Sequence, residues 1–133
     1  MNHIVVGFDG STNAHRALEE ALDIASAETR ITVVAAAQAP APRGEVLPAG
    51  AEGLEERERE LEDARRHPAE RGRDAEVVVV PGAPADVLVE EAESRGADLI
   101  VVGRRGLTGA ERLVMGSLSV KVARTHCSVL IAR

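Results

Sequence analysis

Short apolar runs alternate with longer amphipathic stretches along almost the whole chain. The runs consist almost entirely of aliphatic side chains and cover residues 4–8, 31–37, 75–80, 99–102 and 129–131. Because a strand that is buried on both faces needs apolar residues at every position, these runs predict strands of a parallel sheet. Alanines and leucines recur at helical spacing from Ala14 to Ala25, which predicts a helix with one apolar face. Strands that alternate with helices indicate a single α/β domain over residues 1–133.

Turn and capping residues mark the expected ends of two helices. Residues 9–11 end the first strand, and either Ser11 or Asn13 can cap the helix that follows. Farther along, Pro84 occupies a first helical position, and Gly96 follows the last residue of the same helix.

The segment between the second and third strands is rich in proline, glycine and charge. Residues 38–50 hold three prolines and two glycines and predict a loop, whereas residues 51–71 are dense in Glu and Arg and predict a solvated helix. Because proline lacks a backbone N–H and its ring clashes with the preceding turn, we expect Pro68 to kink this helix or end it near His67. Gly72 provides a C-terminal stop.

The composition restricts both the core and the partners. Hydrophobic residues make up 44% of the 133 residues, but Phe8 is the only Phe, Tyr or Trp. Aliphatic side chains must therefore fill the core, and the aromatic platforms that bind single-stranded nucleic acid are missing. The formal net charge of −6 also argues against a nucleic-acid partner, so an anionic ligand needs local hydrogen-bond donors.

The cysteine content and the apolar segments indicate the compartment. Cys127 is the only cysteine, which excludes an intrachain disulfide and fits a reducing environment. The chain enters a strand at once, without the charged and apolar regions of a signal peptide. Its apolar runs are too short to cross a bilayer. We therefore expect a cytoplasmic protein that makes no membrane contact.

The stretch with the most chemical information follows the fourth apolar run. It reads Gly103-Arg104-Arg105-Gly106 and, after nine further residues, Gly116-Ser117. A helix is expected from Ser117 to Thr125. Glycines between a strand end and a helix start let backbone N–H groups approach a phosphate, and the helix N-terminus adds partial positive charge. The pattern predicts a nucleotide site without a P-loop.

Asp9 is expected to share this site. In an open α/β sheet, ligands bind beyond the carboxyl ends of the strands, where the strand order reverses. If the second and third strands lie on one side of the first strand and the fourth and fifth on the other, Asp9 and Gly103 end neighbouring strands. Asp9 can then accept hydrogen bonds from ribose hydroxyl groups, although an ordinary turn or capping role is equally open.

The glycine–serine stretch offers several groups to a nucleotide. Gly103 would let a sugar or phosphate approach the backbone, and Gly106 and Gly116 would frame the phosphate groups. The hydroxyl groups of Ser117 and Ser119 add donors and a candidate metal ligand. Each of these glycines can also be an ordinary loop or cap residue. Neighbouring arginines can neutralise phosphate or remain solvated, namely Arg104, Arg105 and Arg112.

These motifs resemble the universal stress protein family over nearly the whole chain. The pattern Gly-x2-Gly-x9-Gly-Ser at 103–117 is similar to the nucleotide-binding signature of that family. Residues 4–11 resemble its opening strand and Asp, residues 81–84 its turn before the third helix, and residues 127–131 its closing strand. The resemblance implies a doubly wound, five-stranded parallel sheet of order 3-2-1-4-5 with helices on both faces, Rossmann-like and similar to the adenine nucleotide alpha hydrolases.

The resemblance also implies a ligand and its contacts. ATP, or ADP or AMP in its place, would bind together with Mg²⁺. Asp9 and Gly103 would contact the ribose, and Ala36 falls where the family contacts the adenine. The other implied binding residues are Gly7, Phe8, Val102, Gly106, Gly116, Ser117, Leu118 and Ser119. Family members are commonly homodimers that pair through the last strand, so residues 128–132 are the expected interface.

The sequence departs from the family pattern at three places, and none of them includes a residue that is expected to bind phosphate. The second strand ends Ala35-Ala36-Ala37-Gln38, where the family often has a His, larger apolar residues and an Asp. We therefore expect a wider or weaker adenine pocket. Thr125-His126 replaces a frequent Ala-Pro pair, and Pro68 interrupts a helix that is usually continuous.

Other kinds of chemistry find no support in the sequence. The P-loop pattern GxxxxGK[ST] is absent, and Lys121, the only lysine, lies inside an expected helix. The four histidines lack metal-ligand spacing, and neither a Ser-His-Asp arrangement nor G-x-S-x-G is present. We expect no catalytic residue and no metal site built from protein side chains alone.

Three functions remain open. The first, which the intact signature favours, is an ATP-binding regulatory protein of the stress response. The second is a slow ATPase or a nucleotidyl-transfer enzyme, for which the sequence names neither a general base nor a substrate pocket. The third is a dimeric interaction module that binds no nucleotide.

Overall fold

The computed structural model describes residues 1–37, 51–103 and 120–132, and within them the side chains of 1–36, 59–103 and 120–132. In chain order the elements are β1 (His3–Gly7), α1 (Thr12–Ile24), β2 (Arg30–Ala37), α2 (Ala51–Glu70), β3 (Glu76–Pro81), α3 (Pro84–Arg95), β4 (Leu99–Gly103) and β5 (Ser128–Ala132). Every expected strand is present, with ends within one residue of the predicted bounds. Residues 120–122 are helical. The expected loop at 38–50 lies outside the described residues.

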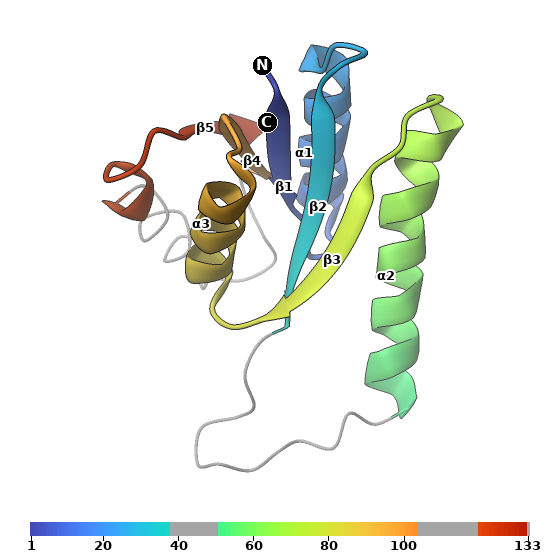
Figure 1. Ribbon diagram of the computed structural model, residues 1–133. Coiled ribbons are helices and arrows are strands. Elements are labelled where there is room, and N and C mark those ends of the chain that lie inside the picture. Colours follow the sequence, from blue (N-terminus) through green and yellow to red (C-terminus); the bar gives the residue numbers. More distant parts are fainter. Residues whose placement is uncertain (38–50, 104–119, 133) are drawn as a thin grey trace, which may run out of the picture.

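The five strands form one parallel sheet in the order β3-β2-β1-β4-β5 (Figure 1). The chain moves outward from β1 to β3, returns through α3, and places β4 on the other side of β1. The predicted order is therefore confirmed. Because β1 pairs directly with β4, with Val6 opposite Val101, the strand order reverses between these two strands.

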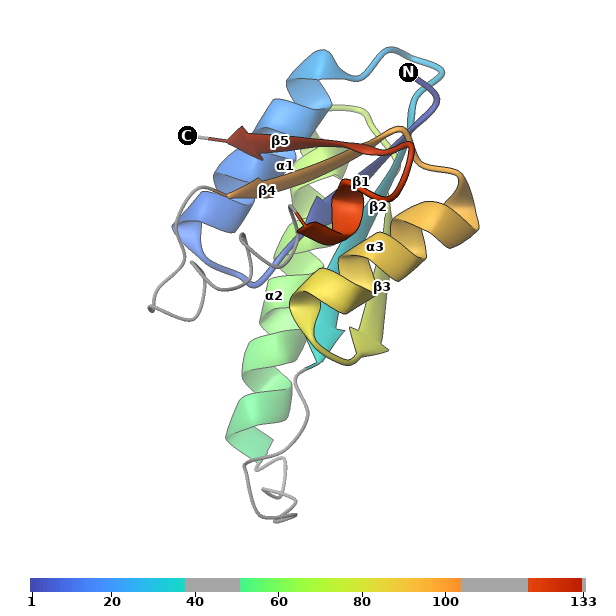
Figure 2. The same ribbon diagram turned by 90° about the vertical axis from the view of Figure 1, so that its left-hand side faces the viewer.

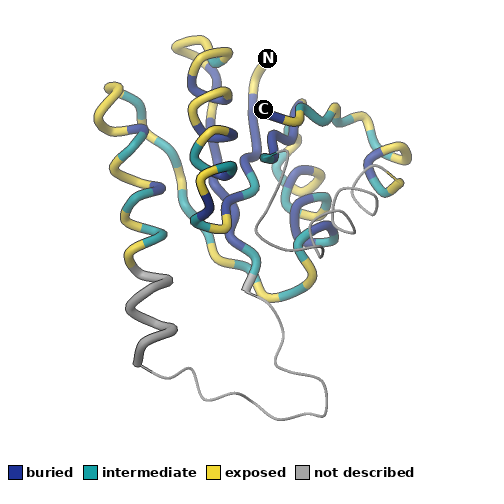
Figure 3. Tube along the Cα trace, turned by 180° about the vertical axis from the view of Figure 1, so that it is seen from behind, coloured by how far each residue is buried: buried dark blue, intermediate teal, exposed yellow. Residues whose placement is uncertain are grey.

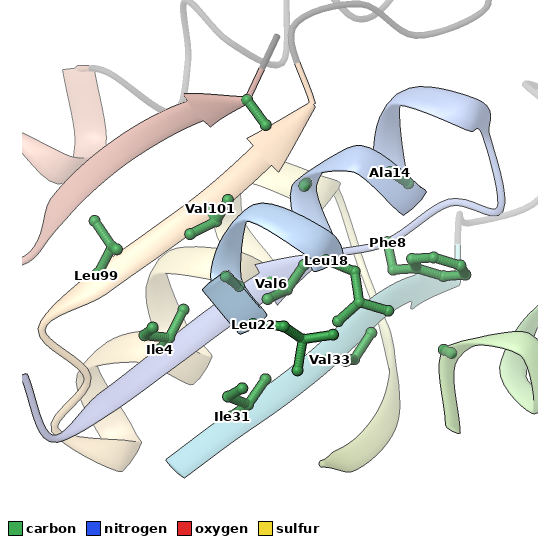
Figure 4. Packing of buried hydrophobic residues seen from close by; sticks show 14 residues of the cluster. Ile4, Val6, Phe8, Ala14, Leu18, Leu22, Ile31, Val33, Leu99 and Val101 are labelled. Atoms are coloured by element: carbon green, nitrogen blue, oxygen red, sulfur yellow. The ribbon is translucent and has the colours of Figure 1, made fainter. Parts of the chain in front are cut away.

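Helices cover both faces of the sheet, with α1 and α2 on one side and α3 on the other (Figure 2). Alternate strand residues supply two hydrophobic clusters, because successive side chains of a strand point to opposite faces. Figure 4 shows the cluster beneath α1, in which Leu18 and Leu22 lie over Val6 and Val33. The second cluster joins Val5, Val34, Ile100 and Val102 to Leu88 of α3, among others. Aliphatic packing thus forms both layers, as the composition predicts.

Burial falls from the centre of the sheet to its edges (Figure 3). Four of the five residues in β1 and in β4 are buried, whereas most residues of β3 and β5 are exposed or half-buried. The two edge strands therefore flank a buried centre, and the candidate site residues follow the ends of the two most buried strands, β1 and β4.

Capping residues begin and end the helices as expected. Of the two candidates at the start of α1, Ser11 is the N-cap, and its Oγ accepts a hydrogen bond from the Ala14 backbone N–H at 3.1 Å. Pro84 stands at the start of α3, and Gly96 ends that helix in the left-handed conformation, at φ 65°.

Pro68 does not end α2 near His67, because the helix continues through it to Glu70. The proline lies in the last turn of the helix, so few residues follow the lost hydrogen bond. Its ring is almost completely buried, which offsets that loss. Its carbonyl oxygen accepts hydrogen bonds from the backbone N–H groups of Arg71 and Arg73 at 3.0 and 2.9 Å. The helix ends in this turn, with Gly72 at φ 69°, as expected of a stop.

Candidate functional site

The loop between β1 and α1 carries the candidate carboxylate. Asp9 is exposed, and its Oδ1 accepts a hydrogen bond from the Ser11 backbone N–H at 2.9 Å. The turn role that the sequence left open is therefore real. Ser11 is buried and caps α1, so the loop is fastened to the helix at the residue that follows Gly10. Asp9 thus lies at the surface, on a loop that hydrogen bonds hold to the start of α1.

The end of β4 lies directly against the start of α1. A Cβ atom built on Gly103 would lie 2.6 Å from the backbone oxygen of Asn13 and 2.7 Å from its carbonyl carbon. Such contacts leave no room for any side chain at position 103. The two strand ends expected to meet, after Asp9 and at Gly103, are thus joined through the first turn of α1. Asn13 is the residue at this junction that sequence reasoning missed as a site residue, since it was considered only as a cap.

Three other predicted site residues contribute mainly to packing. Val102 is buried in the cluster beneath α3, and a Cβ on Gly7 would lie 3.1 to 3.3 Å from the side chains of Leu88 and Val102. Phe8 is buried, its ring meets His15 edge-on at 5.0 Å, and Figure 4 shows it pointing toward α2. The side chains of Phe8 and Val102 belong to the core, so a ligand beyond the strand ends would meet their backbone groups.

Ala36 lies near the end of β2, one strand away from Asp9. It is half-buried and pairs with Val80 of β3. Two residues earlier, the oxygen of Val34 accepts a hydrogen bond from the Phe8 backbone N–H at 2.9 Å. This bond extends the β1–β2 pairing past the end of β1, so the β1–α1 loop and the end of β2 lie side by side.

The residues predicted to bind phosphate cannot be placed relative to these strand ends. Gly106, Gly116, Ser117, Leu118 and Ser119 lie outside the described residues, as do Arg104, Arg105 and Arg112. Their roles stay predictions from the sequence. The described part of the candidate site therefore consists of the β1–α1 loop, the end of β2 and Gly103, where the sequence predicts contacts to the sugar and the base.

A carboxylate from α2 borders the same loop. A Cβ on Gly10 would lie 2.6 Å from the Cγ and Cδ atoms of Glu60. Gly10 has a φ of 82°, a backbone conformation that favours glycine. The sequence gives no sign of this contact, because Glu60 lies within a run of similar charged residues.

Groups with perturbed pKa values lie far from these loops, at the opposite end of the sheet. Hydrogen bonds from the backbone N–H groups of Asn2 and His3 lower the pKa of the Asp98 carboxyl, and burial lowers the pKa of His3. Burial also raises the pKa of the Cys127 thiol. Within residues 1–37, 51–103 and 120–132, no three His, Cys, Asp or Glu side chains come together as they would around a metal ion.

None of the described helices combines the length and the apolar character that crossing a membrane requires.

Comparison with known proteins extends the resemblance to the whole chain. Residues 1–133 match the profile of the Universal stress protein family. A universal stress protein of Thermus aquaticus is 35% identical over 133 residues, covering 98% of this chain and 97% of that protein. Relatives from Bacillus subtilis and Methanocaldococcus jannaschii are 42% identical over 74 residues and 38% over 80. These two alignments cover 50% and 47% of the relatives, so the chain matches about half the length of each.

Solved structures agree with the sheet order. A universal stress protein in complex with cAMP is 32% identical, with a TM-score of 0.73, and the match covers 99% of this chain and 97% of that one. A family protein from Burkholderia pseudomallei is 29% identical at a TM-score of 0.73, covering 98% of this chain and 94% of that one. These neighbours share the doubly wound fold and its switch point between β1 and β4.

Proposed function

The chain belongs to the universal stress protein family, and on this premise we propose that it binds an adenine nucleotide beyond the carboxyl ends of β1 and β4. One structural observation supports the proposal most directly. The β1–α1 loop, with the exposed carboxylate of Asp9, and Gly103 at the end of β4 both adjoin the first turn of α1. This is the switch-point location at which open α/β sheets hold their ligands. The 32% identical neighbour that binds cAMP favours the same ligand class.

In the proposed binding mode the nucleotide runs from β2 toward the segment after β4. Adenine lies beside the backbone at Ala36, and the ribose hydroxyl groups donate hydrogen bonds to Asp9 near Gly103. The phosphates, with Mg²⁺ when ATP is bound, extend to the residues that the sequence motif names: Gly106, Gly116, Ser117, Leu118 and Ser119. ATP is the proposed nucleotide, with ADP and AMP as the alternatives. The protein itself acts as a cytoplasmic regulator in the stress response.

We further propose a homodimer that forms through β5. This strand is an edge of the sheet and pairs only with β4 among the described strands. Ile131 on this strand is 40% exposed, and Val129 and Leu130 are half-buried. An exposed apolar edge strand is a ready template for pairing with another chain. A second copy would cover these side chains.

Thermal unfolding with Mg-ATP tests the nucleotide proposal. At a ligand concentration about 100 times Kd, binding to the folded state adds roughly 2.7 kcal/mol to the free energy of unfolding, so Tm should rise clearly. Gly116→Val should remove the rise, because a β-branched side chain would occupy the space expected for phosphate. Gly72→Val, at an exposed turn outside the site, serves as the control and should keep the rise. An unchanged Tm of the natural protein at millimolar ATP, ADP and AMP would refute nucleotide binding.

A further inference from the structure

The pairing between β4 and β5 reaches the candidate site at its carboxyl end. Gly103, which ends β4, pairs with Ala132 of β5, so the two strands end side by side (Figure 2). Gly103 also lies against the backbone of Asn13 in the first turn of α1. One candidate site residue is therefore held between the start of α1 and the end of the strand through which we propose dimerisation.

The end of β5 packs in the same layer as the first half of α1. Ala132 is buried in the cluster beneath this helix, which also contains Ala14. Ser11 caps the helix, and its backbone N–H donates a hydrogen bond to Asp9. A shift of the β5 end would therefore act on Gly103 directly, and through α1 on the loop that carries Asp9.

Backbone hydrogen bonds hold an edge strand on one side only. Among the described strands β5 pairs with β4 alone, and most of its residues are exposed or half-buried. Segments with few buried contacts open at a lower cost in free energy than the centre of a sheet. Opening of the β5 end would uncover Ala132 and release Gly103 from its pair. A second copy on the free edge would oppose this opening, because β5 would then be paired on both sides.

We infer that nucleotide binding and dimerisation through β5 are coupled by the Gly103–Ala132 pair, so that each strengthens the other. The inference rests on the proposed function, because it takes the nucleotide to lie at Gly103 and the dimer to form through β5. Its two states are a β5 end paired with Gly103, which completes the site, and an open β5 end. Nucleotide favours the paired state at Gly103, and a second copy favours it along the strand.

The population of the paired state in the monomer sets the size of the coupling. If the β5 end is paired in about one fifth of the monomers, the dimer binds nucleotide about fivefold more tightly than the monomer does. A dimer holds two nucleotides, so the dissociation constant of the dimer should then fall about 25-fold when both sites are filled.

Reciprocal binding measurements test the coupling in the natural protein. A sedimentation dilution series gives the dissociation constant of the dimer, which should fall at least about tenfold when Mg-ATP is saturating. Equilibrium titration with Mg-ATP should show tighter binding at a protein concentration about ten times above that constant than at one about ten times below it. The ratio of the two affinities should approach the square root of the shift in the dimer constant, because binding and dimerisation are linked.

Two glycine substitutions separate the Gly103–Ala132 pair from a general loss of stability. Ala132→Gly removes a buried methyl group and loosens the backbone beside Gly103. The monomer of this variant should bind Mg-ATP about threefold or more weakly, whereas its dimer should bind within about twofold of the natural dimer. Ala75→Gly is the matched control, because Ala75 packs against the same cluster directly before β3, at the other edge of the sheet. It should leave both affinities within about twofold of the natural values.

Each contrary result has a distinct meaning. Equal dimer constants with and without Mg-ATP, in a protein that binds it, would overturn the coupling, and so would a natural protein that stays monomeric at every concentration. Equal losses of affinity in the monomers of Ala132→Gly and Ala75→Gly would exclude the Gly103–Ala132 pair as its route. Failure to bind Mg-ATP, ADP and AMP at every protein concentration would instead refute the proposed function.

Discussion

The backbone carbonyl of Asn13 occupies the space that a side chain on Gly103 would need. A Cβ at position 103 would approach the Asn13 oxygen to 2.6 Å, closer than nonbonded atoms can come without a shift of one of them. Gly103 was expected to be a glycine so that a ligand could approach the backbone. The structure adds a reason that holds without ligand, since β4 ends against the first turn of α1.

Gly103→Ala should therefore weaken both the fold and the site. The methyl group meets backbone rather than a flexible side chain, so β4 or α1 must move, at a cost of about 1–3 kcal/mol in the free energy of unfolding. The shift would separate Asp9 from the end of β4 and weaken nucleotide binding. Chemical denaturation and calorimetric titration measure the two effects.

Gly72→Ala is the matched control for that substitution. Gly72 has a φ of 69° and no atom within 4 Å of a built Cβ, so alanine there is strained without a clash. It should lower stability by about 1–2 kcal/mol and leave nucleotide affinity unchanged. Equal loss of affinity in both variants would show that the Gly103 effect is global rather than local.

Removal of the α1 cap should loosen the loop that carries Asp9. The Oγ of Ser11 accepts the Ala14 backbone N–H, and Ser11→Ala leaves that donor without its partner. We expect a loss of about 1 kcal/mol in the free energy of unfolding and faster hydrogen exchange in the first turn of α1. Ser94→Ala, at an exposed position near the end of α3, should stay within about 0.5 kcal/mol of the natural protein. Similar losses in both variants would contradict a capping role.

Charge on β5 should dissociate the proposed dimer. Ile131→Asp places a carboxylate on the exposed side of the edge strand, where a second copy would have to desolvate it. Sedimentation should show a dimer for the natural protein and a monomer for this variant. Ile24→Asp is the control, because Ile24 is 42% exposed on α1, close to the 40% of Ile131 on β5. A monomeric natural protein, or dissociation by both variants alike, would exclude β5 as the interface.

His3 should make the fold sensitive to mild acid. It is 2% exposed, and its Nε2 lies 2.7 Å from the Thr32 Oγ1. Burial first, and then the charge of Arg30, lower the pKa of His3 from its ordinary value of 6.5. The unfolded chain therefore binds the proton more readily than the folded one. This contribution to the free energy of unfolding is complete above pH 6.5 and is lost as the pH falls below that value.

Substitution of His3 separates its contribution from those of other titrating groups. His3→Gln keeps a hydrogen-bonding group for Thr32 but cannot titrate, so the fall in stability between pH 7 and 5 should become shallower. His126→Gln, at an exposed position, should leave the profile unchanged. Denaturation curves at several pH values measure both variants. A His3→Gln profile parallel to that of the natural protein would rule out His3 as the acid-sensitive group.

The local elements of this protein were determined by its sequence. Each apolar run became a strand, because its aliphatic side chains pack on both faces of the sheet, most completely in β1 and β4. Gly96 ends α3 through its left-handed backbone conformation, and Ser11 begins α1 through its side-chain hydroxyl group. Both effects act only on residues that are close in the sequence, so both helix ends could be predicted. The meeting of β1 and β4 was also predictable, since the strand order follows from short-range rules of chain connection together with the family resemblance.

Contacts between distant segments were decided only by the tertiary structure. The sequence marks Pro68 as a helix breaker, but the burial of its ring depends on how α2 packs against the sheet. Glu60 and Gly10 are separated by all of α1 and β2 and by the first half of α2, and nothing in the charged sequence of that helix marks Glu60 as a residue that reaches the loop. Asn13 meets Gly103 because of how closely α1 approaches β4. Local propensities act over a few residues, whereas such approaches are set by the packing of whole layers, and that packing decides what surrounds Asp9.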